Sequence, residues 1–190
     1  MNAASTTVVP NKSRVQDAVT LAADLGLTRT DPAYYALQLG NHVLGGSFYA
    51  TRLYKDLRET NGLVYYVSST FNLGKHRATY TVNYGCDPPN VDGARKIIER
   101  DLAQMQKEPV GKDELEQAKA IALRDIQLSE SGTRSIAYGL LSRSLQDLPL
   151  DEPTQAAKKY IAMSAAEVEA AYAKWLPIDH LVQIVEGPQP

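Results

Sequence analysis

The sequence has few of the residues that stabilise or anchor a chain by means other than a packed core. Cys86 is the one cysteine among 190 residues, so an internal disulfide and a cysteine-based zinc site are both excluded. No run of apolar residues approaches the roughly 18 that a membrane helix requires. Phe and Trp are also scarce, at two and one residues against eleven Tyr. Because Tyr suits half-buried strands and polar grooves, this bias points to surfaces as much as to core.

Neither sign of charge is in excess. Twenty Lys and Arg against 22 Asp and Glu give a formal net charge of -2. This balance does not favour nucleic acid or an anionic membrane as a partner. The share of hydrophobic residues, 44%, and of charged residues, 22%, is typical of a globular domain. A chain of this length can bury a core without covalent staples.

The domain organisation follows from changes in composition at the two ends. Residues 1–14 are polar and are predicted to be a flexible segment or linker. Residues 15–187 are predicted to form a single domain, and residues 188–190 a tail. The first residues lack the basic stretch and apolar core of a signal peptide, so we expect the start of an excised fragment.

The first half of the domain is predicted to hold a strand, two helices and a hairpin. Alternating hydrophobicity indicates a strand at residues 15–21. Asp31-Pro32 is a helix start, and Gly45-Gly46 a helix stop. A second helix is expected from Ser47 to a left-handed cap at Asn61-Gly62. Its buried face would comprise Tyr49, Leu53 and Leu57.

Two adjacent segments are typical of an antiparallel hairpin. Residues 64–71 are rich in β-branched and aromatic side chains. Residues 72–75 suit a turn, and residues 77–86 alternate between apolar and polar side chains. After the hairpin, four helices are expected, starting at Asp87-Pro88, Gly111, Thr133 and Ser164, followed by a strand at residues 181–185. Because strands and helices are partly segregated, the predicted class is α+β.

No complete catalytic apparatus is visible in the chain. None of the histidines, His42, His76 and His180, has a second histidine or a carboxylate three or four residues away, so no helical zinc pair forms. The segment around Ser47 lacks the closing glycine of a nucleophile elbow, and no phosphate-binding loop occurs. Cys86 ends a strand and is interpreted as a small buried hydrophobe. No metal or cofactor site is therefore predicted in this chain.

The segment from Leu44 to Ser69 is harder to explain by packing alone. Arg58 lies at a predicted helix end, where it could simply hydrogen-bond free carbonyls. Tyr65 opens the next strand, where it could be an ordinary aromatic on the pleated surface. The residues alone leave both the structural and the functional interpretation open.

Several ordered motifs resemble one family. Leu57-Arg58-Glu59, Gly62-Leu63 and Tyr65 are similar to the signature of the non-zinc domain of pitrilysin/insulinase-like zinc metallopeptidases. Arg58 and Tyr65 are seven residues apart, which is the spacing of the corresponding arginine and tyrosine in that family. The flanking segments 30–37 and 110–119 also resemble that domain, and the similarity extends over roughly residues 15 to 187.

The resemblance implies a fold and a role for two residues. The fold is a mainly antiparallel sheet covered by helices. In such peptidases two α+β domains enclose a chamber, and one of them carries zinc on an inverted His-x-x-Glu-His motif. The other domain supplies an arginine and a tyrosine. By this resemblance Arg58 binds main-chain carbonyls of the substrate, and Tyr65 donates its hydroxyl to the tetrahedral intermediate or the substrate backbone. The strand that carries Tyr65 would also place the peptide by edge pairing.

The implied partners are a peptide substrate and a zinc-bearing domain, in the same chain or a separate subunit. Zinc is thus expected in the partner domain, and the resemblance also allows a homodimer. It favours a periplasmic or otherwise exported location in a bacterium. Two alternatives remain, a catalytically inactive scaffold or core subunit of the same fold family and an unrelated α+β binding domain.

Overall fold

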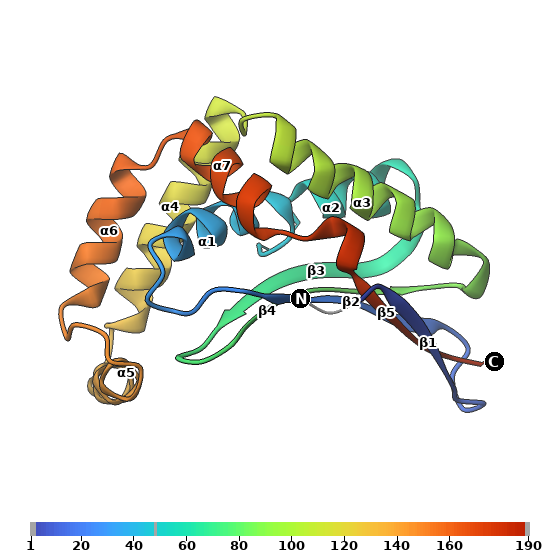
Figure 1. Ribbon diagram of the computed structural model, residues 1–190, viewed down its shortest axis with the longest axis horizontal. Helices are drawn as coiled ribbons and strands as arrows, with labels where there is room; N and C mark the ends of the chain where they lie inside the picture. The colour runs from blue at the N-terminus through green and yellow to red at the C-terminus, as the bar shows by residue number, and fades with distance from the viewer. Residues whose placement is uncertain (1–2, 48, 189–190) are drawn as a thin grey trace.

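The computed structural model describes residues 3–47 and 49–188, and within them one five-stranded sheet carries a layer of helices (Figure 1). The strand order is β1-β5-β2-β4-β3. Strand β1 pairs parallel with β5, and the other pairings are antiparallel. This confirms the α+β class and the mainly antiparallel sheet. The strands are β1 Ser5–Pro10, β2 Asp17–Leu25, β3 Val64–Leu73, β4 Ala78–Cys86 and β5 Val182–Gly187.

Most of the helices lie above one face of the sheet, whereas α5 stands beyond the end of the sheet (Figure 1). No helix in the described ranges is long and apolar enough to cross a membrane. The α-helices are α1 Ala33–Leu44, α2 Arg52–Tyr54, α3 Val91–Lys107, α4 Lys112–Ser129, α5 Thr133–Leu145, α6 Glu152–Ala162 and α7 Ala165–Trp175. Helix α2 runs directly into a π-helical turn over Lys55–Thr60.

The core fills the space between the helices and the facing side of the sheet. Every second residue of β2 and β4 is buried, as expected for strands with one face covered. Helix α3 contributes an apolar stripe to this core. The buried stripe comprises Val91, Ala94, Ile98, Leu102 and Met105. The hairpin is confirmed, but its strands run on to Leu73 and Ala78, so the turn falls at 74–77 rather than 72–75.

The prediction of a linker over residues 1–14 is wrong for Ser5–Pro10, which form β1. All six residues of β1 are exposed, so the strand has no alternation of apolar and polar residues to reveal it. It forms because its backbone pairs with β5, from Ser5 opposite Val182 to Pro10 opposite Gly187. The first predicted strand also starts later than expected, because Val15 is 84% exposed and β2 begins at Asp17. Of the predicted tail, residues 189–190 lie outside the described residues.

The sequence interpretation also missed helix α6, which makes five α-helices after the hairpin in the described chain rather than four. Its buried residues are Pro153, Ala156 and Tyr160, of which only Tyr160 has a large side chain. Such a face carries a weak helical hydrophobic signal. A buried ion pair holds α6 to the segment before α1, because Arg29 Nη2 lies 2.6 Å from Glu152 Oε1.

Helices α1 and α7 approach closely at Gly40. A Cβ built on this glycine would lie 2.4 Å from Cε2 of Tyr172 and 2.8 Å from Cγ1 of Val168. Both of these neighbours are fully buried and are surrounded by other core residues. Gly40 therefore sets the distance at which α7 packs over the sheet.

We predict opposite effects from two glycine-to-alanine changes in helices. Gly40→Ala should lower the free energy of unfolding, because overpacking of about 1–3 kcal/mol outweighs the gain of roughly 1 kcal/mol in helix propensity. Gly93→Ala in α3 is the matched control, since its Cβ would meet only Leu63 at 3.6 Å and 3.9 Å. That variant should gain stability. Urea unfolding of both variants measures the difference, and a gain for Gly40→Ala would contradict this packing.

Candidate functional site

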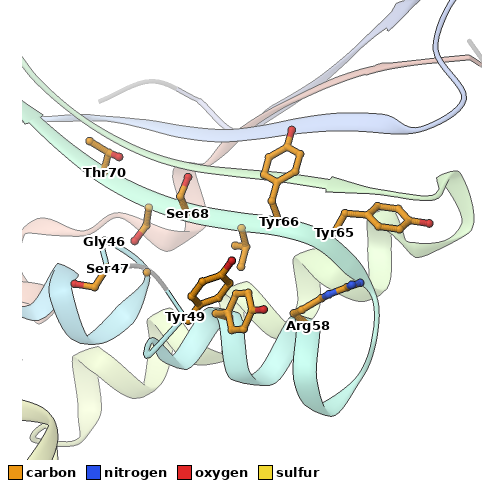
Figure 2. Close-up of a pocket in the computed structure, with 12 residues that line it drawn as sticks. Gly46, Ser47, Tyr49, Arg58, Tyr65, Tyr66, Ser68 and Thr70 are labelled. Carbon is orange, nitrogen blue, oxygen red and sulfur yellow. The ribbon is translucent and has the colours of Figure 1, made fainter.

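A groove of about 680 Å³ runs beside strand β3. One wall is β3 from Tyr65 to Thr70 (Figure 2). The other wall is formed by Gly45–Ser47 after α1, together with Tyr49, Tyr54 and Arg58. Because β3 is the last strand of the sheet, its outer edge borders this groove.

Part of the β3 edge is closed by hydrogen bonds from α1 and the residue after it. The Ser69 N–H donates to the carbonyl oxygen of Gly45 at 2.9 Å. Asn41 Nδ2 donates to the Ser69 carbonyl at 3.0 Å, and Gln38 Nε2 donates to the Phe71 carbonyl at 3.1 Å. These bonds occupy the outward donor and acceptor of Ser69 and the carbonyl oxygen of Phe71, so another chain cannot pair with β3 at Ser69.

The edge opens at Val67. Alternate residues of a strand direct their backbone groups the same way, so the N–H and C=O of Val67 face outward like those of Ser69. No hydrogen bond to these outward groups is found within the described part of the chain. The groove thus contains an exposed donor and acceptor from one residue of an edge strand, which is the requirement for pairing with an extended peptide.

A β-bulge places the predicted tyrosine. Val64 lies opposite Cys86 and Tyr66 opposite Gly85, so Tyr65 is an extra residue in β3. Bulges of this kind redirect a side chain and disturb the ladder locally. Tyr65 and Tyr66 are consequently both exposed, at 46% and 51%. Figure 2 shows Tyr66 on one side of β3, whereas Tyr65 extends along the strand toward its start.

The chain reaches Arg58 through a shorter helix than predicted. Tyr49 was expected on the buried face of this helix, but the structure contradicts this. Tyr49 is 60% exposed, has a φ of 64° and precedes the helix. Thr51 is the N-cap, because its hydroxyl accepts a hydrogen bond from the Tyr54 N–H at 3.3 Å. At the other end, the predicted left-handed cap is confirmed, since Gly62 has a φ of 61°.

The structure brings the two sequence-predicted residues together at one end of the groove. Arg58 Nη1 donates to the carbonyl oxygen of Val64 at 3.0 Å, and the guanidinium carbon lies 5.7 Å from the centroid of the Tyr65 ring. A guanidinium carries five N–H donors. The bond to Val64 uses one of these donors and leaves the others for a further acceptor.

The hydroxyl of Tyr65 has a partner that the sequence did not reveal. It donates to Asp87 Oδ2 at 2.8 Å, and this hydrogen bond raises the pKa of Tyr65. The phenol therefore stays protonated near neutral pH. Because a phenol has one O–H, Tyr65 must release Asp87 before it can donate to another acceptor. Asp87 was predicted only as a helix start, and nothing in its spacing from Tyr65 indicates the contact.

His42 contacts Ser47 in one wall of the groove. Its Nδ1 lies 3.0 Å from the hydroxyl of Ser47, which lines the groove. Burial lowers the pKa of His42, so the imidazole is neutral at physiological pH. In the two described stretches, no three His, Cys, Asp or Glu side chains are close enough to share a metal ion. The residues present therefore do not fit a zinc site.

Comparison with solved structures finds the same fold. A peptidase M16 inactive domain from Pseudomonas fluorescens has a TM-score of 0.83 and 28% identity, over 100% of this chain and 44% of that one. The inactive peptidase domain of a putative zinc protease from Bordetella parapertussis has a TM-score of 0.78 and 16% identity, over 90% of this chain and 92% of that one. The periplasmic protease PqqL of Escherichia coli shares the fold at 17% identity, with a TM-score of 0.77, over 100% of this chain and 21% of that one.

Sequence comparison gives the family. The uncharacterized zinc protease YmxG of Bacillus subtilis is 31% identical over 101 residues, which are 53% of this chain and 24% of that protein. The chain thus spans about a quarter of this relative's length. The model of the peptidase M16 inactive domain matches residues 2–122. This match confirms the resemblance to a non-zinc domain seen in the motifs, and the chain belongs to the peptidase M16 inactive-domain family.

Proposed function

We propose that the chain is the substrate-binding, non-zinc half of a zinc metalloendopeptidase that cleaves peptides inside a two-domain chamber. The observation that carries this proposal is the open edge of β3 at Val67, next to Arg58 and Tyr65 in one groove. An extended peptide can pair with that edge through its main chain, whatever its side chains. Membership of a family of inactive peptidase domains supports the same role.

The two polar side chains would act on the peptide main chain. Arg58 is already fixed by Val64, so it can offer N–H groups to substrate carbonyls without a large loss of side-chain freedom. Tyr65 would leave Asp87 and donate its hydroxyl to the substrate backbone or to an oxygen on which charge develops. Asp87 then serves as the resting partner of the tyrosine.

The proposal requires a partner that supplies the metal. The zinc-bearing domain would be another part of the same protein or a separate subunit, and zinc is expected there. The proposal also includes an exported, periplasmic location for the protein and its assembly as a homodimer. The alternative is an inactive scaffold or core subunit of this fold, in which Arg58 and Tyr65 only stabilise the start of β3.

Arg58→Ala and Tyr65→Phe, made in the complete protein with its zinc domain, should lower peptide turnover. If Tyr65 donates to the developing charge, its loss should reduce kcat by about 10²–10³-fold. Tyr138→Phe is the control, because Tyr138 is 61% exposed and lies on the distant helix α5. Unchanged thermal unfolding would show that the fold is intact. Wild-type turnover in both groove variants would contradict the roles of Arg58 and Tyr65, whereas an unmodified complete protein without peptide turnover would favour the scaffold alternative.

The 190-residue chain alone should neither retain zinc nor cleave peptides, because its described residues do not form a metal site. The measurement is metal content by mass spectrometry after dialysis against buffer without metal, together with a peptide cleavage assay. Stoichiometric zinc that survives dialysis would contradict the assignment.

A further inference from the structure

Helix α5 exposes apolar side chains that the described part of the chain leaves open to solvent. None of its 13 residues is buried, and the helix stands beyond the end of the sheet (Figure 1). A helix of this length is marginal in water unless it packs an apolar face against another element. Gly139 near its centre lowers the helix propensity further. Helix α5 therefore gains stability from any partner that covers it.

The most exposed apolar side chains of α5 form a stripe on one side of the helix. Tyr138, Leu141 and Leu145 are 61%, 55% and 67% exposed. Spacings of three and four residues place these three side chains on one face, which we call the α5 stripe. Ile136 and Leu140 lie on the other side of the helix and are less exposed, at 40% and 39%. The α5 stripe thus faces away from its own domain and is accessible to a second molecule.

Opposite charges stand at the two ends of the α5 stripe. Arg134 continues the stripe one turn before Tyr138, and its guanidinium carbon lies 5.8 Å from the centroid of the Tyr138 ring. No carboxylate in the described ranges forms an ion pair with Arg134. Past the other end of the helix, the Asp147 side chain is 67% exposed and lies 2.5 Å from Lys75 Nζ. The stripe thus begins at an available positive charge and ends at an accessible negative one.

The order of these residues is self-complementary. When two α5 helices pack antiparallel about a two-fold axis, Tyr138 of each copy can lie opposite Leu141 of the other. The same axis places Arg134 opposite Leu145, because the two pairs share one midpoint in the sequence. Asp147 follows Leu145 by two residues, so its carboxylate would lie near Arg134 of the other copy. A parallel pair would instead bring the two Arg134 side chains together, which like-charge repulsion opposes.

We propose that the α5 stripe is a homodimer contact, in which a second copy of this chain packs antiparallel on Tyr138, Leu141 and Leu145. This inference rests on the homodimer included in the proposed function and names its surface. The charges favour a second copy as the partner, because the two-fold axis brings Arg134 and Asp147 together twice. Two helices about 20 Å long bury less than the roughly 1,000 Å² of a stable interface. We therefore expect a weak dimer, with a dissociation constant on the order of 0.1 mM.

Sedimentation equilibrium of the 190-residue chain, at concentrations up to about 1 mM, measures this dimer. Leu141→Glu should raise the dissociation constant about tenfold or more, because it places a carboxylate in an apolar contact. Val15→Glu is the matched control, since Val15 is 84% exposed and precedes β2, and it should leave the dimer unchanged. Tyr138→Phe keeps the ring and should also leave it unchanged. Equal thermal unfolding of the variants would show that the fold is intact.

Cross-linking with a short bismaleimide tests the antiparallel register. A mixture of the Arg134→Cys and Leu145→Cys variants should form a covalent dimer readily. Leu145→Cys alone should react slowly, because the two cysteines would lie about 16 Å apart along an antiparallel pair. The native Cys86 is buried and should not react.

The outcomes separate this inference from the function on which it rests. A dimer that Leu141→Glu does not weaken would overturn the α5 surface and leave the proposed homodimer standing. Cross-linking of Leu145→Cys alone as fast as that of the mixture would overturn the antiparallel contact. A chain that stays monomeric at about 1 mM would overturn both the α5 surface and the proposed homodimer. Peptide turnover by the complete protein tests the groove separately from all of these results.

Discussion

The hydrogen bonds that join Ser69 to Gly45 and Asn41 determine where the edge of the sheet is closed and where it is open. Ser69 is 2% exposed, and its N–H, carbonyl and hydroxyl all bond to these two residues. Such closeness requires glycine at position 45, because a Cβ there would lie 2.6 Å from the Ser69 hydroxyl oxygen. The end of α1 thus covers the edge at Ser69. The groove runs along β3 from Tyr65 to Thr70, and the edge is open at Val67.

The β-bulge at Tyr65 is the second constraint on the groove. Without the extra residue, the alternation of β3 could not place both Val64 and Val67 on the helix side. The bulge accommodates Tyr65 outside this alternation, where its hydroxyl meets Asp87 and its ring lies near Arg58. The main chain of β3 and the guanidinium of Arg58 are thereby linked through Val64. Changes in the bulge would consequently disturb the tyrosine and the arginine together.

Features that depend on local chemistry were predictable from the sequence. The helix start predicted at Ser164 is confirmed, because the Ser164 hydroxyl and the Glu167 carboxylate each accept a hydrogen bond from the other residue's backbone N–H. Helix α5 begins at Thr133 as predicted, and the hairpin follows from the residue patterns of its two segments. Arg58 and Tyr65 were identified by resemblance to a family, and in the structure the Arg58 guanidinium lies beside the Tyr65 ring. Their action on a substrate stays a proposal.

Features that depend on distant partners were not predictable. Strand β1 is exposed along its whole length and exists through pairing with β5, which is 177 residues away (Ser5 opposite Val182). Helix α6 buries a face with few large apolar side chains. The position of Tyr49 follows from the hydroxyl of Thr51, which caps a helix that starts at Arg52 rather than at the predicted Ser47. The contact of Asp87 with Tyr65 depends on the β-bulge in β3, and no pattern in the sequence predicts this bulge.

The central claim is that an extended peptide pairs with β3 at Val67. Amide hydrogen exchange followed by NMR tests it directly, with and without a saturating extended peptide. The account predicts that the Val67 N–H becomes protected when peptide is present, since pairing supplies an acceptor that the described residues do not give it. The Ser69 N–H should not change, because Gly45 already accepts its hydrogen bond. Unchanged exchange at Val67 in the presence of bound peptide would contradict the account.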